Sequence, residues 1–284
     1  MIGHAIKSVL SQTYDKYAII VVDDCSADNT EEAVKSIKDE RIKYIRHEIN
    51  KGVSAARNTG IKASAAKYLT FLDDDDEFLP VYLEKQVAAI SNTPERVAVV
   101  YTDMLAEYGR TTTNKEGNVY KDVIRLEFNC SMECFLIKRG CLETVGLFDE
   151  DLAFTEDVDM AIRLSRQFHF RHVAEPLVVR HPTGGSQCSN IDTFINGFKA
   201  LLNKHFAELS KDRKALSRFY LHIGHFLVLK GSVEEGHRYI IDAVKADPSN
   251  IRAVGASLIL SLYKSKYVHI YQTYMNFKYH KPGR

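Results

Sequence analysis

The chain has 284 residues, of which 45% are hydrophobic, and its formal net charge is +1 at pH 7. This length allows one large domain and a smaller unit, each with a hydrophobic core, and the balanced charge gives no indication of a nucleic-acid partner. The longest uncharged apolar stretch, near residues 253–263, is too short to span a bilayer. Five cysteines without a CxxC pair, and no signal peptide before them, predict reduced thiols and a cytoplasmic location.

The first two thirds of the chain alternate helix-like and strand-like segments, a pattern typical of βα units on a mostly parallel sheet. The spacing of Ile6, Val9 and Leu10 predicts an amphipathic helix over residues 2–13. Strands are predicted at 18–22, 42–46, 68–72 and 97–101, and a loop or hairpin tip at 110–117. Further helices are predicted after residue 28, at 54–64 and 81–90, between 138 and 146, and from about 157 to 168. We therefore expect an α/β domain over residues 1–190.

Beyond about residue 190 the pattern becomes entirely helical, so an all-helical region is expected over 191–284. Within it, residues 216–250 show two helical segments joined at Lys230-Gly231-Ser232, with Asp247-Pro248 opening a third. This spacing resembles one tetratricopeptide-like unit. Because a single repeat cannot bury its face alone, we expect it to pack on the first domain or on further helices. It serves either to dock a partner or as a helical brace.

The last residues are basic and rich in tyrosine. No acidic residue follows Asp247, while Tyr263, Tyr267, Tyr271 and Tyr274 recur at helical spacing. A basic helix with an aromatic face suits the interface of an anionic membrane. In the alternative interpretation the tyrosines belong to a core and the basic residues are ordinary solvated charge.

Two acidic clusters follow predicted strands. Residues 73–76 are four consecutive aspartates directly after the apolar run 68–72, and Asp23-Asp24 follow the run 18–22. Crowded like charges repel unless they are neutralised, and hard divalent cations take oxygen ligands. Open α/β sheets bind ligands at the carboxyl ends of their strands. The sequence therefore predicts a metal-assisted site in a crevice shared by the two clusters, unless residues 73–76 form a solvated acidic turn that caps the following helix.

Four motifs occur in order over roughly residues 1–190. They are IVVDDCSADNT at 20–30 (against VDDGSxDxT), NKGVSAARN at 50–58 (NxGxsxARN), FLDDDD at 71–76 (FLDxDD), and the pair Glu156-Asp157 after FDE at 148–150. Together they resemble the family-2 glycosyltransferases with the GT-A fold. The resemblance implies a Rossmann-like, mostly parallel sheet and a nucleoside-diphosphate-sugar donor.

Two departures from the family pattern are visible. The family opens with a strand of the type VSVIIPTYN, whereas this sequence begins at Met1 inside the helix that follows that strand, so the first strand is expected to be missing. Loss of a central strand would leave unpaired backbone groups on its neighbours. In addition, Cys25 stands where the family usually has glycine.

The resemblance assigns the donor-binding residues. Asp24 corresponds to the aspartate that accepts a hydrogen bond from the nucleotide base, with Asp23 positioning the loop; the alternative is a turn aspartate that caps the next helix. Arg57 corresponds to an arginine near the donor diphosphate, which suits its forked guanidinium. Lys51 is a second phosphate neighbour or an exposed, solvated lysine. His181 contacts the metal or the pyrophosphate, or is an ordinary loop histidine.

The same resemblance assigns the metal and the base. Asp75 is expected to bind Mg²⁺ or Mn²⁺ directly, with Asp73 nearer the ribose and Asp76 assisting. Asp157 corresponds to the catalytic base, which takes a proton from the acceptor hydroxyl in an inverting displacement. Glu156 orients the loop or the acceptor. The alternative for Asp157 is a carboxylate that only favours the first turn of a helix.

These assignments imply a metal-dependent, inverting glycosyltransferase that acts on a hydroxyl of a cell-surface polysaccharide or a lipid-linked saccharide, with a UDP-sugar as the favoured donor. A cytoplasmic location, with peripheral membrane contact through the basic C-terminus, is expected. Two alternatives stay open. One is a nucleotidyltransferase, which would release pyrophosphate, and the other is a non-catalytic helical-repeat module for protein interactions.

Overall fold

The computed structural model describes residues 1–107, 109–152, 154–181, 191–262 and 267. The chain divides into two compact units, one of residues 1–123 and 127–184, the other of residues 124–126 and 185–284. Most of the basic, tyrosine-rich tail lies outside the described residues; of its four tyrosines, Tyr267 is described, and its side chain is buried. Within the described part of the chain, no helix combines the length and the apolar character that a membrane crossing requires.

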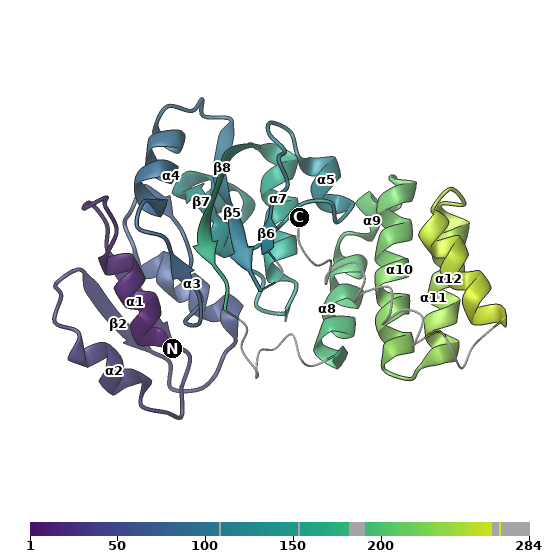
Figure 1. Cartoon of the computed structure of the whole chain (residues 1–284), viewed down its shortest axis with the longest axis horizontal. Coiled ribbons are helices and arrows are strands. Elements are labelled where there is room, and N and C mark those ends of the chain that lie inside the picture. Colours follow the sequence, from purple (N-terminus) through teal and green to yellow (C-terminus); the bar gives the residue numbers. More distant parts are fainter. Residues whose placement is uncertain (108, 153, 182–190, 263–266, 268–284) are drawn as a thin grey trace. The chain divides into compact units, whose positions relative to one another are not determined.

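The first unit contains two sheets. Strands β1 (Ile19–Asp23) and β2 (Ile42–Arg46) pair in parallel. The larger sheet has the order β3 (Tyr68–Leu69), β7 (Phe135–Lys138), β5 (Val97–Ala106), β8 (His169–Val179) and β4 (Glu77–Phe78), with β6 (Gly109–Thr111) pairing with β5. Figure 1 shows β7, β5 and β8 close together, and α4 (Tyr82–Ser91) and α7 (Glu156–Gln167) pack on β8.

The expectation of a mostly parallel sheet needs correction. In the larger sheet β5 and β8 are parallel, whereas the pairs β3–β7, β5–β7, β4–β8 and β5–β6 are antiparallel. Antiparallel partners can follow one another through tight connections without a crossover helix, and β6 follows β5 in this way, with Gly109 at φ 109°. Hydrophobic runs locate strands but do not reveal the direction of their partners.

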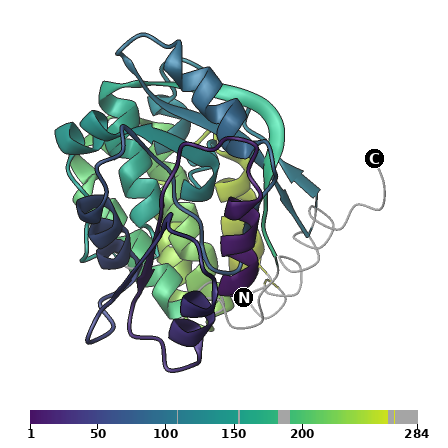
Figure 2. The same cartoon turned by 90° about the vertical axis from the view of Figure 1, so that its left-hand side faces the viewer.

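The predicted helices of this unit are confirmed with shifted ends: α1 (Ile2–Leu10), α2 (Thr30–Ser36), α3 (Val53–Ala63), α4, α6 (Arg139–Val145) and α7. Two short helical elements were not predicted, α5 (Tyr120–Ile124) and the 3₁₀ turn η1 (Met132–Cys134), and neither were the strands β4, β7 and β8. Helix α1, purple in Figure 2, packs against α2 and β4. Helix α7 buries Met160, Ala161 and Leu164 on one face, while its first turn carries acidic residues.

The strand predicted over 68–72 is shorter than expected. β3 ends at Leu69, and residues 70–72 are half-buried and outside any strand. The reason is that β3 pairs with β7 over two residues, so the rest of the apolar run has no ladder to extend in the described part of the chain. The four aspartates therefore follow irregular backbone, and they turn back toward β4 through a hydrogen bond from the Asp76 N–H to the Asp73 carbonyl (3.2 Å).

The second unit is helical in its described part, with α8 (Ile191–Lys204), α9 (Phe206–Leu209), α10 (Arg213–Leu229), α11 (Val233–Ala246) and α12 (Ile251–Leu262). The helices expected on either side of Lys230-Gly231-Ser232 are α10 and α11, which lie side by side in Figure 1. They approach closely at two glycines, because a Cβ placed on Gly224 would lie 2.7 Å from Ile240 Cγ1 and 2.9 Å from the Gly236 carbonyl oxygen. This close packing is what the repeat-like sequence pattern requires.

Candidate active site

Three segments that are far apart in the sequence meet at Arg57. This arginine lies on α3 with its side chain 8% exposed. Its Nη1 donates to Glu156 Oε1 (3.0 Å) and to Asp157 Oδ1, and its Nη2 donates to Asp73 Oδ1 (3.3 Å). The aspartate run after β3 and the first turn of α7 are thus joined by one side chain. The structure brings together a predicted donor-binding residue and the predicted base.

Two aromatic rings lie near this arginine, and the next residue on α3 holds the segment before α7. The Arg57 guanidinium carbon lies 5.9 Å from the ring centroid of Phe71 and 5.4 Å from that of Phe148. Next to it on α3, Asn58 clamps the segment before α7: its Nδ2 donates to the Phe148 carbonyl (2.9 Å), and its Oδ1 accepts from the Phe148 N–H (2.9 Å). Asn58 therefore has a structural role, and it fixes the distance between α3 and the loop that leads to Asp157.

The two carboxylates at the start of α7 differ in exposure. Glu156 is 8% exposed, and burial, with Asp157 nearby, raises its pKa to about 7. Asp157 is 22% exposed, so a ligand can reach it. Burial raises its pKa, while Arg57 opposes the increase, and the Met132 N–H donates to its Oδ2 (3.3 Å). The ion pair with Arg57 is therefore what favours the ionised form of Asp157.

A second group of charges lies around Arg180, directly after β8. Arg180 Nη2 donates to Glu133 Oε1 (3.2 Å), and its Nε lies 3.7 Å from Asp76 Oδ2. Both carboxylates are almost fully buried, and burial raises the pKa of Asp76 to about 6 and that of Glu133 to about 8. Asp73 and Asp157 add to the increase at Glu133. The Asp76 carboxylate also accepts from the His181 N–H (3.2 Å).

The carboxyl groups of the site bear on whether a divalent metal could bind there. In the described ranges, no group of three His, Cys, Asp or Glu side chains is placed to hold an ion. However, Mg²⁺ that keeps water ligands and shares substrate phosphates needs one or two carboxylates. Here two guanidinium groups, Arg57 and Arg180, face a larger set of carboxylates: Asp73, Asp76, Glu133, Glu156 and Asp157. This excess of carboxyl groups over guanidinium groups fits a bound cation.

The other predicted site residues are placed as follows. Asp75 is half-buried, between Asp73 and Asp76 of the cluster just described. Lys51 has an exposed side chain. The His181 imidazole is exposed, and its Nε2 lies 3.3 Å from Oε1 of Glu77, the residue after the aspartate run. Neither Lys51 nor His181 has a recorded side-chain contact with the Arg57 cluster.

Asp24 organises the loop before α3. Its Oδ1 lies 2.7 Å from His47 Nδ1 and accepts from the Lys51 N–H (2.9 Å), and its Oδ2 accepts from the Gly52 N–H (2.7 Å). Burial alone would raise the pKa of Asp24, but these hydrogen bonds outweigh it, and the pKa lies below its usual value. Asp24 thus stabilises the start of α3, whereas its alternative role was to cap α2, the helix before α3.

Comparison with known proteins decides the family. Residues 1–141 match the family model described as Glycosyl transferase family 2. The chain belongs to this family. The Escherichia coli glucosyltransferase WfgD, a UDP-Glc:alpha-D-GlcNAc-diphosphoundecaprenol beta-1,3-glucosyltransferase, is 41% identical over 87 residues, which cover 31% of this chain and 34% of that protein. The succinoglycan biosynthesis protein ExoO of Rhizobium meliloti is 27% identical over 300 residues, covering 94% of this chain and 84% of ExoO.

A solved structure shows the fold of this family-2 glycosyltransferase chain. The mannosyltransferase PcManGT from Pyrobaculum calidifontis, in complex with GDP-Man and Mn²⁺, aligns with a TM-score of 0.58 at 17% identity, covering 94% of this chain and 79% of that one. The fold is GT-A, followed by a helical C-terminal region. Two Rickettsia glycosyltransferases and WfgD are 32 to 41% identical to this chain over the matched residues. The matched residues make up 22 to 34% of the length of those proteins.

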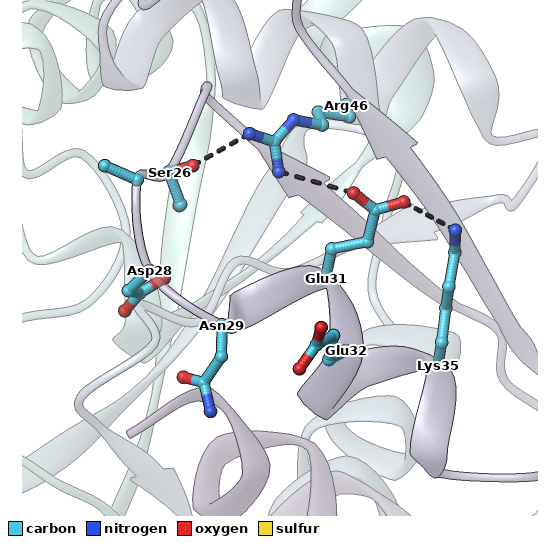
Figure 3. A pocket seen from close by; sticks show the side chains of 8 residues that line it. Ser26, Asp28, Asn29, Glu31, Glu32, Lys35 and Arg46 are labelled. Atoms are coloured by element: carbon cyan, nitrogen blue, oxygen red, sulfur yellow. Dashed lines mark hydrogen bonds and ion pairs between the residues drawn. The ribbon is translucent and has the colours of Figure 1, made fainter.

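An open depression of about 510 Å³ lies elsewhere on this family-2 glycosyltransferase domain. Figure 3 shows Arg46 reaching across it to the Ser26 carbonyl and to Glu31, which in turn pairs with Lys35. Asp23 lies next to it, buried, and accepts from the Ser26 N–H (2.7 Å) and Arg46 Nη1 (2.9 Å), so it positions this loop. The lining contains none of the residues of the Arg57 or Arg180 clusters, and we do not place the chemistry there.

The sequence motifs missed two residues of the site, Glu133 and Arg180. Glu133 lies in η1, within a segment that matches no motif, and its ionisable side chain resembles any surface glutamate until the fold buries it. Arg180 directly precedes His181, and the motifs assigned the metal or phosphate contact to the histidine because an imidazole is a common ligand of both. Arg180 directly follows the apolar triplet Leu177-Val178-Val179, just as the two aspartate clusters directly follow apolar runs.

Proposed function

We propose that this chain is a metal-dependent, inverting glycosyltransferase that moves a sugar from a nucleoside-diphosphate donor to a hydroxyl of a cell-surface polysaccharide or lipid-linked saccharide. The observation that carries the proposal is the Arg57 bridge. One buried guanidinium contacts Asp73, from the donor-side aspartate run, and Asp157, the base candidate. The groups that a displacement needs on the donor and on the acceptor therefore share one site.

In this mechanism Asp157 accepts the proton of the acceptor hydroxyl while that oxygen attacks the anomeric carbon from the face opposite the leaving diphosphate. Attack from the opposite face inverts the configuration. Asp157 must be ionised to act as a base, and its pairing with Arg57 favours that form against the effect of burial. Glu156, with its raised pKa, shares the same guanidinium and fixes the orientation of the pair.

Asp75 would hold the divalent cation, with Asp73 nearer the ribose and Asp76 assisting from its buried position. The bound cation would stabilise the negative charge that develops on the departing nucleoside diphosphate. The excess of carboxylates over guanidinium groups supports this assignment, and so does the Mn²⁺ in the PcManGT complex. Asp75 is half-buried whereas Asp76 is 2% exposed, so Asp75 is the better candidate for direct contact with an ion that enters with the donor.

A UDP-sugar donor and a lipid-linked acceptor are the favoured substrates. Two relatives, WfgD and WfaP of Escherichia coli, are named for transfer from UDP-Glc to a diphosphoundecaprenol-linked sugar. Such an acceptor lies at a membrane surface, which agrees with a cytoplasmic enzyme that contacts the inner face of the membrane through its basic C-terminus. The helical unit would then dock the acceptor or a partner.

Isothermal titration of UDP, GDP, CDP and dTDP tests the proposal, each with Mn²⁺ and with a chelator. We expect one of them to bind with Mn²⁺ and to bind at least about tenfold more weakly without it. Asp75→Asn should show the same loss in the presence of Mn²⁺, whereas the matched control Asp74→Asn should stay within about twofold of wild type. Failure of every nucleotide to bind, or metal-independent binding, would contradict the proposal. Release of pyrophosphate in a turnover assay would instead favour a nucleotidyltransferase.

A further inference from the structure

The two arginines of the site differ in accessibility. Arg57 is 8% exposed, and its two terminal nitrogens donate to three carboxylates. Arg180 is 45% exposed, although its two carboxylate partners are buried. Its Nε and Nη2 face those partners, and no hydrogen bond is recorded for Nη1 within the described residues. A ligand that enters the site can therefore reach the Arg180 guanidinium, whereas Arg57 is already saturated.

The backbone of Arg180 is fixed by a hydrogen bond to the neighbouring strand. It follows the last residue of β8, and its backbone N–H donates to the Leu105 carbonyl of the parallel strand β5 (2.8 Å). The carboxyl ends of parallel strands are the usual ligand-binding edge of an α/β sheet. Asp76, which faces Arg180, is one residue from Asp75 and belongs to the aspartate run expected to hold the donor. The guanidinium thus lies beside the part of the site where a diphosphate would be bound.

Glu133 is the buried partner that orients this arginine. Its side chain is 1% exposed, its Oε1 accepts from Arg180 Nη2 (3.2 Å), and no partner is recorded for its Oε2. The Glu133 carbonyl accepts from the hydroxyl of the fully buried Tyr82 (2.8 Å), which fixes the backbone of η1. A carboxylate is costly to bury, so its retention beside one accessible arginine points to a positioning role.

We propose that Arg180 binds the diphosphate of the donor and that Glu133 is the positioning residue that holds the guanidinium in place. The forked guanidinium matches pairs of phosphate oxygens, and the charge-assisted hydrogen bonds are among the stronger ones that proteins make. This inference rests on the proposed function, because it assigns a phosphate-binding residue to the same site. It differs from the expectation drawn from the motifs, in which Arg57 and Lys51 were the phosphate neighbours.

Calorimetric titration with a nucleoside diphosphate and the matching nucleoside, for example UDP and uridine, with Mn²⁺ present, tests this role. We expect Arg180→Gln to weaken UDP binding by about 10- to 100-fold while uridine binding stays within about twofold. Arg180→Lys should recover part of the loss, and Glu133→Leu, which removes the acceptor for Arg180 Nη2, should weaken UDP binding by about three- to tenfold, again without affecting uridine. The matched control is Arg171→Gln, on the same strand but exposed near its other end, which should bind both ligands as wild type does.

The outcomes separate this inference from the proposed function. If the wild-type chain binds no nucleoside diphosphate, the proposed function itself fails. If the wild type binds UDP and Arg180→Gln binds it equally well, the role of Arg180 is refuted. Equal losses of UDP and uridine binding would show a general structural effect and would also refute it. If Arg180→Gln loses UDP binding but Glu133→Leu does not, the positioning role of Glu133 is wrong.

Discussion

Replacement of Arg57 by lysine or methionine is the sharpest perturbation that the site offers. The guanidinium contacts Glu156, Asp157 and Asp73 at once, and lysine, as a flexible point charge, cannot reproduce that fork. Methionine removes the charge altogether. A hydrogen bond to a charged partner contributes roughly 1.5–3 kcal/mol, and 1.36 kcal/mol corresponds to one pKa unit, so losing this contact should raise the pKa of Asp157 by about 1–2 units.

The direction of the pH effect follows from this increase. A base with a higher pKa stays protonated, and therefore inactive, up to a higher pH. We expect the acid limb of the pH–rate profile to move upward by about 1–2 units in Arg57→Met, with a smaller shift in Arg57→Lys. On the acid limb the rate should be about 10- to 100-fold lower than that of wild type at the same pH, and it should recover as the pH rises above the shifted limb, while nucleoside diphosphate affinity changes by less than about threefold.

Release of the nucleoside diphosphate from the best-binding donor, followed from pH 5 to 9 with an acceptor saccharide, is the assay. Arg163→Lys is the matched control, because Arg163 is a half-buried arginine on α7 that donates to Asp159 (2.8 Å) and has no recorded contact with Asp157. It should lose stability without a shift of the profile. If Arg57→Met keeps the wild-type pH profile but loses nucleotide affinity, then Arg57 contacts the diphosphate, and its role as the partner of the base is refuted.

Three further predictions concern stability. Cys25 has a left-handed backbone (φ 66°), so Cys25→Gly should raise the free energy of unfolding by about 0.5–1 kcal/mol in urea titration, and a decrease would contradict the strain. Gly224→Ala should lower it by about 1–3 kcal/mol because its Cβ would lie 2.7 Å from Ile240, whereas Gly255→Ala, with nothing within 4 Å, should be neutral or stabilising; equal effects would refute the close packing. The pKa of Glu133 is raised to about 8 in the folded chain, so the folded state holds a proton that the unfolded state has released, and stability falls as pH rises from about 4.5 to 8. Glu133→Gln should flatten this fall by on the order of 1–3 kcal/mol in calorimetric unfolding, and an unchanged slope would contradict the raised pKa.

The sequence located much of the site because the motifs are tied to strand ends and helix starts. Asp73 was predicted at the end of a strand and Asp157 at the start of a helix, and their common contact is Arg57, a third motif residue. What the motifs did not show is that the Arg57 guanidinium contacts carboxylates, because partner choice depends on how three distant segments pack. Glu133 was out of reach for a related reason. Its importance comes from burial, which residue type and spacing do not reveal.

The fold was predictable to a similar degree. Helical periodicity indicated α1 and α7, which bury Ala5 and Ile6 in the first case and Met160, Ala161 and Leu164 in the second. Strand pairing was less accessible, since a run of apolar residues looks the same beside a parallel or an antiparallel neighbour. The short β3 shows this limit, because Thr70–Leu72 have strong strand-forming residues but no ladder to join among the described strands.

The most direct measurement of the central claim is transfer by Asp157→Asn, which keeps the shape of the side chain and removes its basicity. We expect this variant to bind the nucleoside diphosphate with Mn²⁺ within about threefold of wild type and to lose transfer by at least about 100-fold. Transfer at the wild-type rate would remove Asp157 from the mechanism and contradict the proposed base.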